Sequence, residues 1–380
     1  MNKEEISFIN TDFSRRITSL RFILAVLVVF IHSTAGENNQ LSFADSVVQA
    51  NVPVYAVIVQ DIFTNILGGA AVPLFFVISA YLFFAKPKNI KENIKSKTKS
   101  IVVPYIFWTV ITVLLYFAAQ SFCFSRNFFS KQENLVRSWH IAEYIQAFTG
   151  RKVSYIDYWV PLVYQFWYLR NLILFMAVSP IIKFLASRFP VSYFCVIFIL
   201  SLLRCADAFY DPLWIFPAIF YFSMGFYAMK HIQKAMNFLD SFKWKDFISA
   251  YILFAAVSIY IGFVESPAAP YIGFVRCILT IMLFIKAAGK ISANDKAYKT
   301  LSRLSVYSFW IYAAHAPFVV TAIKKIIIKL IPMNGGFILV QFFLTAFLCI
   351  AFLMAFGILL RHRLPKIFAL VTGSRTSRTS

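Results

Sequence analysis

The residues that could do chemistry are ionisable side chains within apolar stretches long enough to cross a membrane. Arg21 and His32 lie in one such stretch, eleven residues apart. Eleven helical steps of about 100° bring both side chains to the same helix face, separated by about 16 Å along the axis. The two side chains therefore cannot touch, but they could line one passage. Because ionisable groups inside a membrane are rare and usually functional, this pattern favours a functional role for His32.

His315 and Arg170 lie within two further apolar stretches. An arginine near the middle of a span costs about 2.5 kcal/mol or more unless it is paired or hydrated, so Arg170 predicts a polar cavity. A histidine in a span can also hydrogen-bond a neighbouring helix as a packing residue, which contributes at most about 2 kcal/mol. For His315, the packing role and a functional role fit the sequence equally well.

Lys95, Lys97 and Lys99 form a basic segment immediately before an apolar stretch. Lys95 and Lys99 are four residues apart and share a helix face, where their charges repel each other. A cluster of this kind is the usual signal of a cytoplasmic flank and needs no ligand. Phosphate binding is the second interpretation.

Five other cations have simpler interpretations. Arg204 has Asp207 one turn further on, which predicts a local ion pair. Arg276 is close to the outer boundary of a span and is expected to extend its side chain towards water. Lys324, Lys325 and Lys329 lie where a span should leave the membrane on the outer side, so they are expected either to do the same or to mark an interfacial helix.

The elements that must position these residues are membrane helices. Of the 380 residues 60% are hydrophobic and 14% are charged, and the mean hydropathy is +0.72. These values exclude a soluble globular protein and a cytosolic enzyme with a membrane tail. They predict an all-α polytopic helix bundle that forms one domain over residues 1–380. Ten spans are expected, near residues 17–35, 61–85, 101–120, 162–182, 190–206, 213–229, 246–264, 271–288, 305–325 and 337–360.

The net charge of +21 is distributed along the chain as a topology signal. Most Lys and Arg residues lie in the segments that are cytoplasmic if the N-terminus is inside, so both termini are predicted to be cytoplasmic. Basic residues that flank spans do not form a nucleic-acid surface, and no nucleic-acid partner is expected. The five cysteines contain neither a disulfide framework nor a C-x-x-C metal site.

The outer segment 121–161 is too long for a plain connection and is rich in aromatic residues and in charges of both signs. It could lie over a site as a lid. A solvated loop with an interfacial turn fits the sequence equally well.

Five blocks of the sequence, taken in order, resemble the integral-membrane acyltransferase-3 family. Each block is weak alone, but five in the family's order together with ten spans are specific. The blocks are residues 19–33 with Arg21 and His32, residues 73–83, the basic segment 95–105, residues 167–170, and residues 311–317 with His315.

The resemblance implies that an acyl group, usually acetyl, is transferred from cytoplasmic acetyl-CoA to a hydroxyl of a cell-surface polysaccharide or a lipid-linked glycan. It implies a location in a bacterial inner or plasma membrane and an essential His32. Two departures stand out, since Lys95 and Lys99 replace arginines that are common in the family and Ala80 stands where glycine is common. Lysine binds phosphate as a point charge, without the two-pronged contact of arginine.

The resemblance and the spacing together suggest a mechanism. His32 would act as general base on the acceptor hydroxyl, and Arg170 or His315 would hold the developing oxyanion. The pantetheine arm of acetyl-CoA, about 15 to 20 Å long, would lie along the face that joins Arg21 to His32. Trp167 and Tyr168 are the candidates for binding the substrate. The residues expected to hold the phosphates of acetyl-CoA are Arg21, Lys95, Lys97 and Lys99; no metal is expected.

Two other classes of protein remain open from the residues alone. A secondary transporter or glycan exporter could use intramembrane His and Arg to relay protons or to bind an anionic solute. No internal repeat of the kind that marks many transporters is visible. A membrane scaffold without chemistry is the other class, and Arg170 argues against it.

Overall fold

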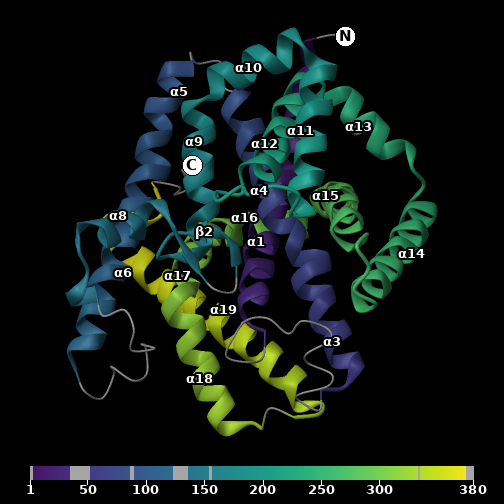
Figure 1. Ribbon diagram of the computed structural model, residues 1–380. Helices are drawn as coiled ribbons and strands as arrows, with labels where there is room; N and C mark the ends of the chain where they lie inside the picture. The colour runs from purple at the N-terminus through teal and green to yellow at the C-terminus, as the bar shows by residue number, and fades with distance from the viewer. Residues whose placement is uncertain are drawn as a thin grey trace.

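A single helix lies at the centre of the molecule and positions the site. The computed structural model describes residues 3–34, 52–85, 90–122, 136–153, 156–332 and 334–373. In this part of the chain α1 (Lys3–His32) runs through the bundle and packs against α15 (Ala269–Ala293), α17 (Ser308–Ala314) and α19 (Phe337–Arg363) (Figure 1). His32, the last residue of α1, is therefore held among several neighbouring helices rather than on an outer face of the bundle.

The remaining elements follow in chain order. The other α-helices are α3 Val54–Asp61, α4 Ala71–Phe84, α5 Ile90–Lys97, α6 Val103–Ser121, α8 Ile141–Thr149, α9 Trp167–Ala177, α10 Ser179–Arg188, α11 Pro190–Cys205, α12 Ile215–Lys230, α13 Ile232–Ser241, α14 Trp244–Phe263, α16 Asp295–Ser305, α18 Val320–Leu330 and α20 Pro365–Val371. Tighter or wider helical turns are η1 Ile62–Leu67, η2 Gly68–Ala70, η3 Thr98–Val102, η4 Val136–Ser138, η5 Tyr164–Phe166 and η6 His315–Val319.

The structure confirms a polytopic membrane protein built from helices. Within the described residues, six helices are long and apolar enough to cross a membrane, or seven if a pair bent by 67° after Ala177 is one span. Helices also occupy the other predicted ranges, but α1 carries three arginines and α12 has only 16 residues. The number of ten crossings and the cytoplasmic side of the termini stay predictions.

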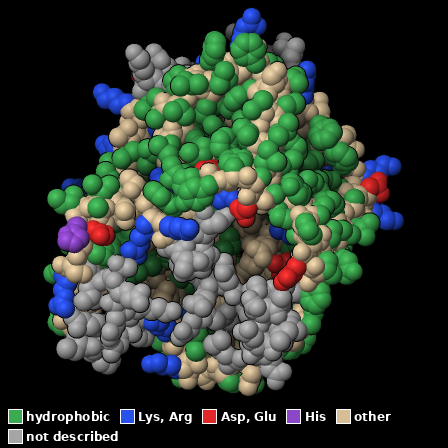
Figure 2. Space-filling view, viewed as in Figure 1, with side chains coloured by type: hydrophobic (Ala, Val, Ile, Leu, Met, Phe, Trp, Pro, Cys, Tyr) green, Lys and Arg blue, Asp and Glu red, His purple; other side chains and the backbone are tan. Residues whose placement is uncertain are grey.

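The surface has the character that a bilayer requires. Hydrophobic side chains cover most of the upper part of the face in Figure 2, and Lys and Arg gather towards its edges. Large apolar side chains are exposed along several helices, such as Leu253 on α14 at 68% and Phe352 on α19 at 54%. Such contiguous exposure is unusual for a soluble protein and is the expected lipid-facing surface of a membrane bundle.

Close packing between α4 and α12 explains one departure from the family's pattern. A Cβ atom at Gly225 would lie 2.2 Å from the carbonyl oxygen of Val77 and 2.8 Å from the Cβ atom of Ala80. The two helices approach so closely here that one of the two facing positions, 80 or 225, must be glycine. Here the glycine is on α12, which leaves room for alanine at position 80.

The ninth predicted span is broken beside its histidine. Ala316 has the extended dihedral angles φ −131° and ψ 154°, and Pro317 has no N–H to donate. The break frees the carbonyl oxygens of Ala313 and Ala316, and both accept hydrogen bonds from Nε2 of Gln165, at 3.2 and 2.7 Å. Non-helical backbone at this depth is stable only where such internal partners exist.

The fold is helical as predicted, apart from one short hairpin in segment 121–161. This antiparallel pair, β1 (Arg151–Val153) with β2 (Ile156–Val160), follows α8. The β-branched and aromatic residues of β2 suit a strand, but at five residues it gives too weak a signal to detect in the sequence. The segment also includes residues 123–135 and 154–155, which lie outside the described residues, and its predicted role as a lid stays a prediction.

Candidate active site

The two intramembrane histidines lie side by side. His32 is the last residue of α1 and His315 is the first residue of η6. Their ring centroids are 5.3 Å apart with an interplanar angle of 29°. The ring of Tyr164 packs against His32 in an edge-to-face arrangement at 4.9 Å. The fold therefore places two imidazoles in one site, with His315 buried and His32 half-buried, although they are far apart in the sequence.

The hydrogen bonds of His315 define its tautomer. Its Nδ1 lies 3.1 Å from the carbonyl oxygen of Ile311 and 2.9 Å from that of Tyr312. Carbonyl oxygens only accept, so Nδ1 carries the proton and donates. In the neutral ring Nε2 then has a lone pair, and it is buried without a hydrogen-bond partner among the described residues. A buried acceptor left unused is costly, which marks Nε2 as a position prepared for a substrate group or a proton.

Lys324 is a third ionisable residue at this site. Its side chain is buried in α18, and it lies within electrostatic range of His32. The expectation that its side chain extends to water is wrong, because Lys324 is only 9% exposed.

Aromatic residues connect the histidines with Arg21. Tyr168 is within electrostatic range of Arg21, and its ring centroid is 6.0 Å from that of Tyr312. The Tyr312 ring in turn lies 6.4 Å from that of His315. Arg21 and the histidine pair are thus the two ends of one row of neighbouring side chains, which matches the shared helix face that the spacing of Arg21 and His32 predicts.

Tyr168 and Trp167, the predicted substrate-binding residues, differ in their surroundings. The Tyr168 hydroxyl is 2.7 Å from Oγ of Ser79 and donates to the carbonyl oxygen of Phe75 at 3.3 Å. Trp167 packs against Phe76, with ring centroids 6.0 Å apart. Tyr168 therefore belongs to the row beside Arg21, whereas Trp167 packs on its flank.

Arg170 makes most of its hydrogen bonds within the protein. Its guanidinium donates to the backbone carbonyls of Thr149 (3.0 Å), Trp159 (2.8 Å) and Leu213 (3.0 Å), while its Nε donates to Oδ1 of Asn171. Four of its five N–H groups are occupied by these bonds. Arg170 thus joins the end of α8, the strand β2 and the segment before α12, and it has little capacity left for an oxyanion.

A glycine makes room for this arginine. Gly150 has a φ of +113°, and a Cβ atom there would lie 2.7 Å from Nη1 of Arg170. Only glycine adopts this backbone conformation without strain. The side chain of Asn171 completes the arrangement by donating to the carbonyl oxygens of Leu213 and Trp214, at 2.8 and 3.3 Å.

The helix α5, which carries two of the predicted phosphate-binding lysines, lies towards the end of the bundle where the chain begins (Figure 1). Lys95 and Lys97 are in the last turn of α5, and Lys99 is in η3. Lys95 and Lys99 are exposed, and Lys97 is half-buried. The basic segment is thus accessible at one end of α1, and His32 lies at the other end.

Comparison with known proteins identifies the chain. A family model described as the acyltransferase domain (Acyl_transf_3) matches residues 15–362. The chain belongs to this acyltransferase family. It is an enzyme that transfers acyl groups, and family membership decides against the transporter and scaffold interpretations.

The chain is also similar to a protein of polysaccharide biosynthesis along most of its length. The chain is 26% identical over 315 residues to the succinoglycan biosynthesis protein ExoH of Rhizobium meliloti (strain 1021), which covers 80% of this chain and 79% of that protein. No solved structure matches this acyltransferase.

The matched range of the acyltransferase domain contains all the residues that the sequence singled out, from Arg21 to His315. The structure adds Gln165, which holds the broken helix beside His315, and it places the charge of Lys324 within electrostatic range of His32. Neither has a sequence signal of its own, because their importance comes from partners about 150 and 290 residues away. Among the described residues, no three His, Cys, Asp or Glu side chains gather as a metal site would require.

Proposed function

We propose that the protein is a membrane O-acyltransferase that moves an acetyl or similar short acyl group from cytoplasmic acyl-CoA to a hydroxyl of a cell-surface polysaccharide or lipid-linked glycan. The observation that supports this most strongly is the stacked pair of His32 and His315, with a free Nε2 on His315. The name of the relative ExoH, a succinoglycan biosynthesis protein, supports a polysaccharide acceptor.

The donor enters from the cytoplasmic end of the bundle. Lys95, Lys97, Lys99 and Arg21 hold the phosphates of acyl-CoA through charge-assisted hydrogen bonds. The pantetheine arm follows the row from Arg21 past Tyr168 and Tyr312, a path of about 16 Å along α1. This path brings the thioester to His32.

Transfer then needs a base beside the thioester. His32 takes the proton from the acceptor hydroxyl while the oxygen forms a bond with the acyl carbon, and the C–S bond breaks as the tetrahedral intermediate collapses. The proton passes from His32 to the sulfur of the departing CoA, so the enzyme returns to its starting state. Both imidazoles must be neutral at the start, and burial in an apolar bundle favours the neutral form.

His315 supports this step through its free Nε2. As an acceptor, Nε2 can bind the acceptor hydroxyl or receive its proton, and the anchored Nδ1 fixes the direction of the ring. Holding an oxyanion would require a proton on Nε2, so we assign that role to Lys324, the cation nearest to His32 in electrostatic terms. Arg170 becomes a positioning residue, since its N–H groups are bonded to backbone carbonyls.

Replacement of His32 tests the proposal. Purified His32→Ala protein, reconstituted in nanodiscs with radiolabelled acetyl-CoA and de-O-acylated polysaccharide from the producing strain, should lose at least about a hundredfold in transfer, the usual contribution of a general base. His362→Ala removes an exposed histidine at the end of α19 and serves as the matched control. Full transfer by a folded His32→Ala protein would contradict the mechanism.

The side from which the donor enters has its own test. Proteoliposomes of known orientation, with acetyl-CoA either enclosed or added outside, should transfer only when acetyl-CoA meets the end that carries Lys95 and Lys99. Equal transfer from both sides would contradict the path along α1.

A further inference from the structure

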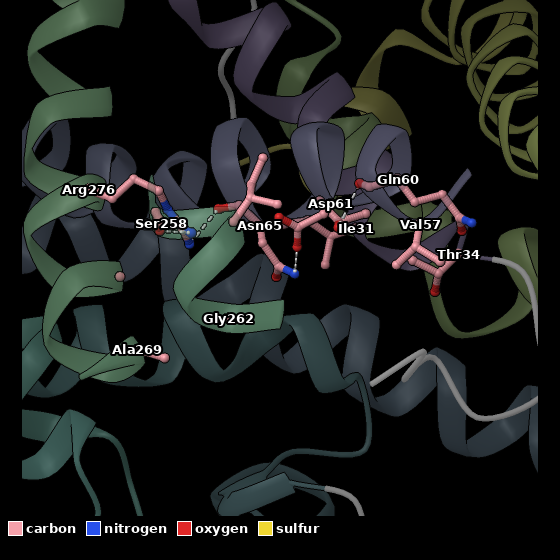
Figure 3. A pocket seen from close by; sticks show the side chains of 13 residues that line it. Ile31, Thr34, Val57, Gln60, Asp61, Asn65, Ser258, Gly262, Ala269 and Arg276 are labelled. Atoms are coloured by element: carbon pink, nitrogen blue, oxygen red, sulfur yellow. Dashed lines mark hydrogen bonds between the residues drawn. The ribbon is translucent and has the colours of Figure 1, made fainter. Parts of the chain in front are cut away.

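A second polar site lies beside the histidines, on another flank of α1. It is a cavity of about 370 Å³, within the range of about 300 to 1,000 Å³ that small-molecule sites occupy. Figure 3 shows Asp61, Asn65, Ser258 and Arg276 lying close together, with Thr34 further along. The polar residues that line it include Thr34 just after α1, Asp61 of α3, Asn65 of η1, Ser258 of α14 and Arg276 of α15.

The polar groups of this cavity are already oriented. Asp61 accepts a hydrogen bond from Nδ2 of Asn65 at 2.5 Å, and Arg276 donates to Oγ of Ser258 at 2.7 Å. Asp61 and Arg276 act on each other electrostatically, so a carboxylate and a guanidinium face the same space. The hydroxyl of Thr34 and Nε of Arg276 are buried without a hydrogen-bond partner among the described residues.

The position of this cluster within predicted spans calls for water or a polar ligand beside it. Asp61, Asn65 and Arg276 belong to apolar helices that are long enough to cross a membrane. Charged groups at such depth are expensive, and they persist where they line a hydrated cavity or bind a polar ligand. Arg276 was expected merely to extend towards water, but its bonds to Ser258 and to the carbonyl oxygen of Asn65 hold it against the cavity.

The chemistry of the lining identifies the class of ligand. A carboxylate and carbonyl groups accept from hydroxyls, while a guanidinium, amides and hydroxyls donate to them, and one sugar residue offers both kinds of group. The near balance of one acidic and one basic group does not suit a phosphate or another strongly charged ligand. The lining thus favours an uncharged molecule rich in hydroxyls.

The reacting sugar itself would not occupy this cavity. Ile31 lines it, but the following residue, His32, projects about 100° further around α1 and faces His315 instead. Cavity and histidines are consequently on adjacent flanks of one helix, whose full diameter is about 10 Å. A sugar residue in the cavity can therefore be a neighbour of the acylated residue in the same chain.

We propose that the cavity is a saccharide subsite, which binds a sugar residue of the acceptor next to or near the one that is acylated. This inference rests on the proposed function. Contacts remote from the reacting atoms raise the specificity for longer acceptors, because their binding energy is available only when the acceptor reaches them.

Acceptors of different length test the subsite. De-O-acylated polysaccharide of the producing strain is cut by mild acid and separated into fragments of one repeating unit and single sugars. For each, kcat/KM is measured with the full-length protein in nanodiscs. Asp61→Asn and Arg276→Gln should each lower the ratio of kcat/KM for long over short acceptors by about tenfold, the factor expected when a hydrogen bond to a charged group is lost.

Two further variants keep the test decisive. Ser258→Ala removes only the hydroxyl that accepts from Arg276 and should lower the same ratio by a smaller factor, without the risk that a charged pair is disrupted. Tyr251→Phe is the matched control, since it removes a buried hydrogen bond to Thr280 between the same helices, α14 and α15, outside the cavity. The ratio should not change in Tyr251→Phe.

Three results would overturn the subsite. One is an unchanged ratio of kcat/KM for long over short acceptors in folded Asp61→Asn and Arg276→Gln. Another is an equal loss of kcat/KM for long and short acceptors. The third is a loss that depends on the lipid composition of the nanodisc and not on acceptor length, which would identify a lipid headgroup as the occupant. Absence of transfer by the unmodified protein would instead count against the proposed function.

Discussion

Arg170 and the histidine pair are both polar groups buried in an apolar bundle, yet they are satisfied to different degrees. Four N–H groups of Arg170 are bonded, mainly to backbone carbonyls. His315, by contrast, has one nitrogen anchored and the other buried without a partner among the described residues. The comparison teaches that a buried polar group whose bonds are all used maintains architecture, whereas one with an unused position is available for chemistry.

Of the four predictions that follow, His315→Asn should give the largest effect, a loss of acyl transfer. The asparagine amide can still donate to the carbonyl oxygens of Ile311 and Tyr312, but nothing replaces Nε2. Transfer from acetyl-CoA should fall by about a hundredfold or more while thermal stability is kept, as expected for loss of an acid–base group. Normal transfer by this variant would reduce His315 to a packing residue.

Arg170→Met should show the opposite profile. Its loss removes the side-chain donor to the carbonyl oxygens of Thr149 and Trp159 and one of the two donors to that of Leu213, which should cost about 2 kcal/mol or more in the free energy of unfolding. Unfolding in detergent, followed by tryptophan fluorescence, measures this cost, and Arg188→Met at an exposed position is the control. A stable Arg170→Met protein that lost transfer completely would show that Arg170 takes part in the reaction itself.

Gly150→Ala tests the structural role of the site around Arg170. The substitution forces alanine into a φ of +113° and places its Cβ atom 2.7 Å from Nη1 of Arg170, which should cost about 1 to 3 kcal/mol of stability. Gly335→Ala has a positive φ but nothing within 4 Å, so it is the control for backbone strain alone. Combining Gly150→Ala with Arg170→Met should cost less than the sum of the two, because the clash disappears with the arginine.

Lys95→Gln and Lys99→Gln should have the smallest effect. Both lysines are exposed, and exposed ion pairs contribute at most about 1 kcal/mol, so each substitution should raise the KM for acetyl-CoA by no more than about fivefold. High salt should reduce the difference between variant and unmodified protein. Lys296→Gln on α16 is the matched control, and an equal effect there would remove the phosphate role from the two lysines.

Much of the fold could be predicted because helix formation in an apolar chain depends on neighbouring residues. Hydropathy located a helix in each of the ten predicted ranges, although it missed the hairpin β1–β2, whose strands are too short to give a clear alternation. The shared face of Arg21 and His32 could also be predicted, since it follows from helix geometry alone. The roles of Arg170 and Lys324 could not, because each depends on partners from distant segments.

The sequence by itself determined that the protein is a membrane helix bundle, which five ordered blocks place among acyltransferases, since composition and motifs are properties of the chain. Only the tertiary structure decided that His315 stacks on His32 and that Arg170 donates its hydrogen bonds mainly to backbone carbonyls. It also decided that Asp61 and Arg276 line one cavity. The physical reason is that these arrangements depend on where the helix breaks at Ala316 and on which segments then satisfy the freed backbone groups.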